Sequence, residues 1–142
     1  MIGLNVAVSG LNAAEKRLDA AAANIVNARD TAPTRAPPVQ PVAGPSASPP
    51  QDDGLYRPVD VWQSTVEGGG TKAQYVERQP ARTTDFAPDE PMANSEGLVD
   101  RPNVGFSTEF VDMMLARRAY EAALKAVQVG DEMLGTTIDA RS

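Results

Sequence analysis

The side chains that most often carry out chemistry in proteins are scarce in this sequence. It contains no histidine, the commonest general base and metal ligand, and no cysteine, which removes thiol chemistry and disulfide bonds. Three groupings remain as candidates. They are the acidic pair Asp89-Glu90 for a cation, the glycine run at 68–70 for a phosphate, and the basic pair Arg117-Arg118 for an interaction site.

None of these groupings has the pattern that its chemistry requires. The acidic pair lacks the ligand spacing of an EF-hand loop, so it is typical of a solvated loop. The glycine run is not followed by the lysine and helix of a phosphate-binding loop, and a hairpin turn explains it. Adjacent arginines are typical of a charged surface. We therefore predict a protein that is not an enzyme, with no catalytic residues and no metal or cofactor site.

The overall composition narrows the class of partner. The formal net charge is −6, whereas nucleic acids and anionic membrane surfaces both attract basic patches. No segment approaches the roughly 20 apolar residues that span a bilayer, so we expect no membrane insertion. The N-terminus lacks the basic region and the continuous apolar region of a cleaved signal peptide. Taken alone, these features favour a cytoplasmic protein that does not bind nucleic acid.

The N-terminal segment 1–28 is predicted to form one helix. Leucine or isoleucine alternates with alanine at spacings of three and four residues, which is an unbroken heptad pattern. The larger residues of this stripe are Leu4, Leu11, Leu18 and Ile25. Asn27 and Pro33 supply the signals for the end of the helix.

A second helix is predicted from about residue 107 to about residue 138, with Ser107 or Thr108 as its cap. Its first apolar stripe again follows the spacing of three and four, and consists mainly of Phe110, Met113, Tyr120, Leu124, Val127 and Leu134. Short amphipathic helices are marginal alone in water, so we expect the two stripes to pair with each other.

The second helix also carries a second apolar row on another face. This row includes Val111, Leu115, Val129 and Met133, and Arg118 is its one strong interruption. A helix with a single partner needs only one stripe, so the second row predicts a subunit interface. The alternative is that residues 54–79 of the same chain cover it.

The segment between the helices is predicted to contain little regular structure. Residues 32–50 hold seven of the twelve prolines and should be extended. Residues 54–79 could form a hairpin around the glycines at 68–70, and residues 80–105 have the composition of turns. We therefore predict a mainly α fold, in which paired terminal helices form a coiled-coil stalk. Its parts are an N-terminal helix (1–30), a Pro-rich linker (31–53), a small β and loop region (54–105) and a C-terminal helix (106–142).

Two motifs accompany the predicted helices. The first helix ends in Ala23-Asn24-Ile25-Val26-Asn27-Ala28, which is similar to the Asn-x-x-Asn-Ala signature of flagellar rod and hook proteins. Pro102-Asn103-Val104 and the run from Glu109 to Ala122 resemble the Pro-Asn-Val, Glu-Met-Val and Ala-x-Arg-x-Tyr-x-Ala elements of the same proteins. The chain thus resembles the flagellar basal-body rod protein family, in particular its shortest, proximal-rod members. The motif residues are Asn24, Asn27, Asn103, Glu109, Arg118 and Tyr120.

The resemblance implies a structural role, and it replaces the prediction of a cytoplasmic protein. It implies export through the flagellar type III apparatus without a cleaved signal peptide, and polymerisation into a helical tube that forms the periplasmic rod and transmits torque. The implied partners are copies of this chain, other rod and hook-basal-body proteins, and the export apparatus. The alternative is a cytoplasmic coiled-coil adaptor or export chaperone of a type III secretion system, which would share the helices without polymerising.

Overall fold

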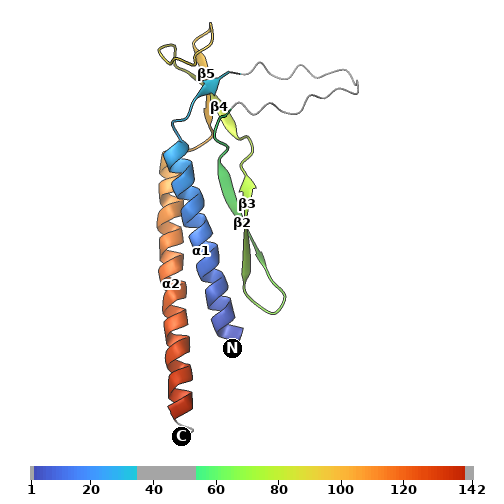
Figure 1. The fold of residues 1–142 in the computed structure, drawn as a ribbon, viewed down its shortest axis with the longest axis vertical. Coiled ribbons are helices and arrows are strands. Elements are labelled where there is room, and N and C mark those ends of the chain that lie inside the picture. The colour runs from blue at the N-terminus through green and yellow to red at the C-terminus, as the bar shows by residue number, and fades with distance from the viewer. Residues whose placement is uncertain (1, 35–53, 140–142) are drawn as a thin grey trace, which may run out of the picture.

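Two long helices lie side by side and run in opposite directions in the computed structural model of this chain, which describes residues 2–34 and 54–139 (Figure 1). The first helix, α1, spans Ile2–Asn27, and the second, α2, spans Phe106–Asp139. The start of α1 lies beside the C-terminal half of α2, because Leu4 lies next to Gly130 and Gly10 lies next to Ala123. Both terminal segments therefore belong to one elongated unit.

A β-hairpin packs along α1. Strands β2 (Val59–Thr65) and β3 (Thr71–Glu77) pair antiparallel over their whole lengths. Gly68, Gly69 and Gly70 form the turn with φ of 90°, 94° and 107°, a conformation that other residues rarely adopt. A Cβ atom on Gly70 would lie 2.7 Å from the Ser9 hydroxyl, so the turn also needs glycine to approach α1. The predicted hairpin is confirmed.

A second sheet lies beyond the end of α1 and the start of α2 (Figure 1). It consists of β1 (Ala32–Pro33), β4 (Arg82–Phe86) and β5 (Leu98–Pro102), all antiparallel, with β5 in the centre. The side chains of Val99 and Asp100 on β5 are buried, and Thr84 donates a hydrogen bond of 2.7 Å to the Asp100 carboxylate. This sheet closes the end of the helix pair.

The predicted fold class, a mainly α coiled-coil stalk with one small hairpin, is therefore wrong. The chain is an α+β protein with two antiparallel sheets, and the three-stranded sheet uses residues that were expected to form a linker or turns. Its strands are short and carry charged or proline residues, so they show no clear alternation of apolar and polar residues. The predicted Pro-rich linker contains β1, and residues 35–53 of it lie outside the described residues.

The buried apolar residues of the helices are mostly alanines. Gly10, Ala14 and Ala21 lie on the side of α1 that faces α2, and Ala13 and Ala20 lie on the neighbouring side that faces the hairpin. All four alanines are at most 5% exposed, and Ala116 of α2 is fully buried. Small side chains allow α1 to approach α2 and the hairpin closely at the same time, so α1 is the central element of the unit. No helix among residues 2–34 and 54–139 is long and apolar enough to cross a bilayer.

We predict that the α1–α2 contact does not tolerate a larger side chain at Ala116. Ala116→Leu enlarges a side chain that is fully buried, and overpacking of this kind costs about 1–3 kcal/mol of unfolding free energy. The measurement is urea denaturation of the purified subunit, followed by circular dichroism. Ala126→Leu, at an exposed position of the same helix, is the control and should change stability little. Equal stability of the two variants would contradict the close contact.

Candidate assembly site

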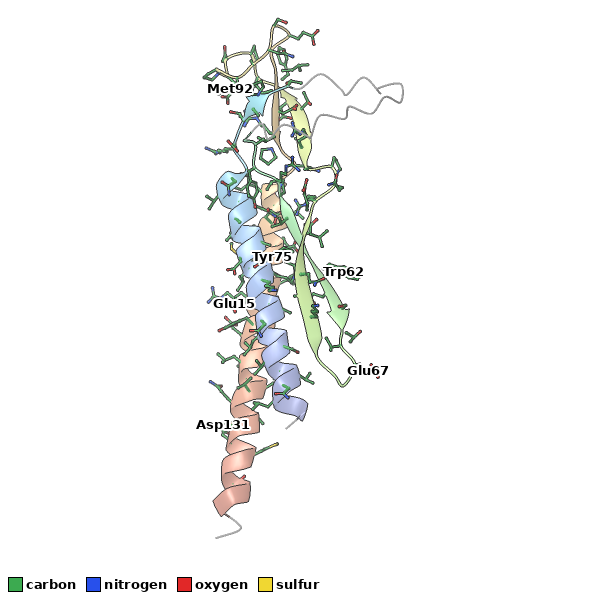
Figure 2. The ribbon with its side chains drawn as sticks, turned by 45° about the vertical axis from the view of Figure 1, so that its right-hand side comes forward. Glu15, Trp62, Glu67, Tyr75, Met92 and Asp131 are labelled. Atoms are coloured by element: carbon green, nitrogen blue, oxygen red, sulfur yellow. The ribbon has the colours of Figure 1, made fainter. Side chains whose placement is uncertain are left out.

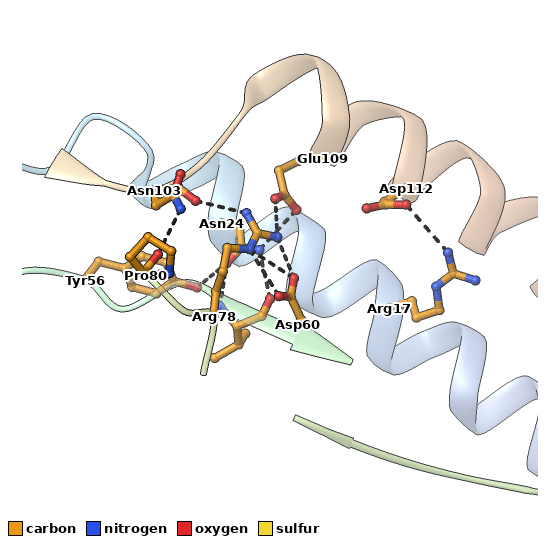
Figure 3. A network of polar contacts seen from close by, with 10 residues as sticks. Arg17, Asn24, Tyr56, Asp60, Arg78, Pro80, Asn103, Glu109 and Asp112 are labelled. Carbon is orange, nitrogen blue, oxygen red and sulfur yellow. Dashed lines mark hydrogen bonds and ion pairs between the residues drawn. The ribbon is translucent and has the colours of Figure 1, made fainter. Parts of the chain in front are cut away.

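A cluster of polar side chains, in which Asn24 and Glu109 are buried, lies where the end of α1, the hairpin and the first turn of α2 meet (Figure 3). We call this cluster the polar junction; it consists of Asn24, Tyr56, Asp60, Arg78, Asn103 and Glu109. Its members come from both helices, the hairpin and the connecting segments, so the cluster ties together parts that are far apart in the sequence.

The carboxylate of Glu109 is the most deeply buried charge of the polar junction, with 2% of the residue exposed. It lies in the first turn of α2, where the helix dipole favours a negative charge. The guanidinium of Arg78 lies 2.7 Å away, and the Asn24 amide donates a hydrogen bond of 3.1 Å. A buried carboxylate without such partners would be strongly unfavourable, so Glu109 requires both of them.

Asn24 uses the whole hydrogen-bonding capacity of its amide group. Its nitrogen donates to the Val59 carbonyl at 2.9 Å and to Glu109, and its oxygen accepts bonds from the Val59 N–H at 3.1 Å and the Tyr56 hydroxyl at 2.9 Å. The two hydrogen bonds with the Val59 backbone have the same pattern as those from a residue of a neighbouring strand. The amide therefore fixes the start of β2 on the last turns of α1.

Arg78 joins the hairpin to the segment that leads into α2. Its guanidinium lies 2.6 Å from the Asp60 carboxylate and donates a hydrogen bond of 3.0 Å to the Asn103 carbonyl. The Asn103 amide in turn donates to the Pro80 carbonyl at 2.9 Å. Hydrogen bonding to Asp60, and then to Glu109, raises the pKa of Arg78, so the side chain is a permanent cation in the junction.

The six motif residues do not form a single site. Asn24, Asn103 and Glu109 come together in the polar junction. Asn27 instead donates a hydrogen bond of 2.8 Å to the Ala23 carbonyl within α1, Tyr120 is half-buried, and Arg118 is exposed on α2. The motif therefore combines residues that stabilise the fold with at least one surface residue.

Sequence reasoning missed the partners that Glu109 needs. Arg78 lies at the end of the hairpin and Asp60 lies in β2, in a pattern that resembles an ordinary exposed strand. A further long-range contact that the sequence did not indicate is the hydrogen bond of 3.0 Å from the Tyr56 N–H to the Asp30 carboxylate. The one available signal was the place of Glu109 in the family motif, which gives no information about a distant arginine.

The structure places most of the predicted helix-pairing residues partly inside the molecule. The half-buried ones are Leu4, Leu11, Leu18, Ile25, Met113, Tyr120 and Val127. Phe110 and Leu124 are instead 56% and 39% exposed, and the side chain of Leu134 lies outside the described part. The fully buried positions of α2 are Glu109, directly before Phe110, and Ala116, about one helical turn beyond Asp112. The stripe of large residues is thus displaced from the true contact line, which consists of small and polar residues.

The second apolar row of α2 is uncovered. Val111, Leu115, Val129 and Met133 are 47–65% exposed. The hairpin does not cover this row, because it packs on α1, where Lys16 donates a hydrogen bond of 2.9 Å to the Ala73 carbonyl. Figure 2 shows Tyr75 of β3 next to α1, whereas Trp62 of β2 points away from the helices. A long apolar row on the surface is typical of a contact with another molecule.

The described residues contain no cluster of three or more potential metal-ligating side chains. Paired terminal helices, a junction in which every polar side chain serves the packing of elements, and an exposed apolar row together characterise a structural subunit.

Comparisons with known proteins agree with this class. Residues 4–32 match the family described as flagella basal body rod protein, and residues 95–140 match the C-terminal family of flagellar basal body rod FlgEFG proteins. The flagellar basal-body rod protein FlgC of Salmonella typhimurium is 30% identical over 134 residues, which cover 94% of this chain and 92% of that protein. FlgC of Bacillus subtilis is 31% identical over 139 residues, 92% and 91% of the two chains. FlgC of Agrobacterium fabrum is 29% identical over 139 residues, 94% and 89%.

The chain belongs to the flagellar basal-body rod protein family and is a rod protein of the FlgC type. It is a structural subunit of the flagellar basal body, in a family of structural proteins that assemble with other rod proteins. The alternative of a cytoplasmic adaptor or export chaperone is therefore set aside.

We predict that removing Arg78 destabilises the subunit more than removing an arginine that pairs on the surface. Arg78→Met leaves Glu109 buried without its cation, and removing one partner of a buried pair costs about 3–5 kcal/mol. Arg57→Met is the matched control, because Arg57 pairs with Glu77 on the surface at 3.3 Å and should cost about 0–1 kcal/mol. Urea denaturation of both variants measures the difference, and a similar loss in the two would contradict the importance of the junction.

The Tyr56 hydroxyl should make stability depend on pH in the alkaline range. Burial, and then the nearby Glu109 carboxylate, raises the pKa of Tyr56 above 10.0. The folded chain therefore keeps a proton that the unfolded chain releases, so this contribution is complete below pH 10.0 and is lost as the pH rises above it.

The comparison is between the natural chain and Tyr56→Phe. At neutral pH the variant should be less stable by about 1 kcal/mol, since it lacks the hydrogen bond to Asn24. Above about pH 10 the difference should shrink as the natural chain loses stability faster. Unfolding free energies from urea titrations at several alkaline pH values give the two curves. Parallel curves would show that the Tyr56 hydroxyl does not titrate in a buried site.

Proposed function

We propose that this chain polymerises as a helical tube in the proximal part of the flagellar rod, and that the exposed apolar row of α2 is its subunit interface. The observation that carries the proposal is the exposure of Val111, Leu115, Val129 and Met133, which lie away from the side of α2 that packs on α1. In a heterologous contact, two different surfaces of the same subunit meet. If the rotation between neighbouring subunits does not close a ring, the contact repeats along a helix and produces a tube. A tube of rigid subunits can transmit torque and leave a central channel.

The parts of the chain have different roles in this proposal. Residues 1–30 and 106–142 form the assembling helices, and the helix-pairing residues hold them together as one rigid unit. Residues 54–105 form the hairpin, which braces the helices, and most of the second sheet, which contacts other rod and hook-basal-body proteins. Residues 31–53 connect the first helix with this region.

The proposal includes the route by which the subunit reaches the rod. Export through the flagellar type III apparatus, without a cleaved signal peptide, would deliver it to the periplasmic rod. A subunit with small buried side chains and few aromatic residues is suited to this route, because it has a limited apolar core to refold.

The interface is tested by removing apolar surface from the row. Leu115→Ser combined with Val129→Ser should block incorporation into the rod and abolish swimming, because a smaller apolar contact binds more weakly. The two residues are exposed in the subunit, so its melting temperature should change little. Isolated basal bodies, analysed with an antibody against this chain, give the incorporated amount.

The matched control removes equally exposed apolar residues from the hairpin. Val66→Ser with Val76→Ser changes two valines that are 47% and 48% exposed and lie away from α2. This variant should be incorporated. Normal incorporation of the α2 variant would refute the proposed interface, and a lowered melting temperature of the isolated α2 variant would show that the row is covered within the chain.

A further inference from the structure

Arg118 and Lys125 are two cations within the exposed apolar face of α2. They share this face with the apolar residues, at successive spacings of three or four residues. We call the face the outer row; its members are Val111, Leu115, Arg118, Ala122, Lys125 and Val129, all exposed. Among the described residues, neither Arg118 nor Lys125 forms an ion pair. An interface that buried two unpaired cations would be costly, so the outer row requires an acidic partner surface.

Such a surface exists on α1 of the same chain. The face of α1 on the side away from α2 is exposed along its length, and Asp19 on this face also lines a hollow with Val59 and Tyr75 of the hairpin. We call it the free face; its members are Val8, Asn12, Glu15, Asp19, Ala22 and Val26. Among the described residues, Glu15 and Asp19 form no ion pair either. The free face is thus acidic in the middle and apolar at both ends, and the outer row is basic in the middle and apolar at both ends.

The spacings of the two faces match. The separation in sequence between Val8 and Val26 is the same as the separation between Val111 and Val129. In both helices this corresponds to about 27 Å along the axis. If the helices are placed antiparallel with Val26 opposite Val111, then Val8 lies opposite Val129.

The same alignment brings the opposite charges together. Each step towards the start of α1 then corresponds to one step towards the end of α2, so Asp19 lies opposite Arg118. Glu15 lies opposite Ala122, about one helical turn from both Arg118 and Lys125. A shift by one turn would bring Glu15 opposite Arg118 or Lys125 in place of the Asp19–Arg118 pair, but it would displace both pairs of valines. The charges and the terminal valines together therefore select this alignment.

This alignment requires that α1 of one copy runs antiparallel to α2 of the other, and a helical assembly provides this orientation. Within one chain α1 and α2 are antiparallel (Figure 1). Subunits that repeat along one axis keep the same polarity, so α1 of each copy is also antiparallel to α2 of its neighbours. The free face of one copy and the outer row of another can therefore meet in the direction that matches their charges.

We propose that the free face of α1 binds the outer row of α2 of a second copy of this chain, with Asp19 and Glu15 pairing with Arg118 and Lys125. This inference rests on the proposed function and names the partner surface and the register. An apolar contact alone could slide by a helical turn, whereas complementary charges exclude wrong partners and, together with the valines at both ends, fix the register. Both faces occur on one chain, which is why the partner is a second copy.

Charge exchange tests the pairing. Arg118→Glu should abolish incorporation into the rod, because it places a further carboxylate opposite Asp19 and Glu15. Adding Asp19→Arg to the same chain should restore swimming at least partly. Arg117→Glu is the control: Arg117 is exposed on another face and lies 3.0 Å from Glu121 of its own helix, so this variant should still be incorporated. Circular dichroism of each purified variant verifies that the helices are retained. Normal incorporation of Arg118→Glu, or failure of Asp19→Arg to improve it, would overturn the pairing.

Cross-linking tests the register independently. The chain has no cysteine, so introduced cysteines are the only thiols. Ala22→Cys with Leu115→Cys retains the charges of both faces and puts the two thiols opposite each other in the proposed alignment. Oxidised rods should then yield a ladder of linked copies in a non-reducing gel. Ala22→Cys with Ala126→Cys is the control on the same side of α2, about three helical turns out of register, and should yield no ladder.

The possible failures are distinguishable. If the Ala22→Cys, Leu115→Cys chain is present in rods without a ladder, or if the control pair links instead, the inferred register is wrong and the tube can still form by another contact. If Leu115→Ser with Val129→Ser is incorporated normally, the outer row is not an interface, and the proposed function itself fails.

Discussion

The carboxylate of Glu109 is a buried charge, and much of this structure follows from that constraint. It needs a cation and a hydrogen-bond donor within about 3 Å. Arg78 supplies the cation from the end of the hairpin, and Asn24 supplies the donor from the last turns of α1. Both contacts exist only when the two helices and the hairpin are in their final arrangement. In any other arrangement the buried carboxylate would lack its partners. The charge therefore destabilises other arrangements more than it stabilises this one.

The need for such a constraint follows from the small side chains of the helix contacts. Alanine surfaces fit together closely, but they also fit in neighbouring registers, because one methyl group resembles the next. The α1–α2 contact line contains Gly10, Ala14 and Ala21 on one side and Ala116 and Ala123 on the other. Packing of this kind supplies contact area without fixing the register, and the polar junction supplies the register at one end of the pair. The second, exposed ion pair of Arg17 and Asp112, at 3.7 Å, lies next to it on the same side.

The sequence predicts the local elements well and their long-range relations poorly. The long helices and the glycine turn of the hairpin depend on neighbouring residues, so periodicity and turn chemistry reveal them. The second sheet depends on pairing β1 with β5, which lie on opposite sides of the hairpin in the sequence, through the pairs Ala32–Asp100 and Pro33–Val99. No local pattern indicates this pairing. Phe110 shows the same limit for the site. A large residue in an apolar stripe was expected to pack, but the buried position directly before it belongs to Glu109, whose partner Arg78 lies in a distant part of the sequence.

Charges are distributed differently inside and outside this helix pair, and the distribution suits a subunit that has to assemble. Inside, Glu109 and Arg78 are satisfied within one chain, so the folded subunit needs no neighbour to neutralise them. Outside, Glu15 and Asp19 on α1 and Arg118 and Lys125 on α2 stay solvated in the free subunit, where exposed charges cost little and keep it soluble. The same charges become favourable when a complementary face approaches, because removal of water strengthens their attraction. A buried pair thus defines the fold of each copy, while the unpaired surface charges are available for the proposed contact between copies.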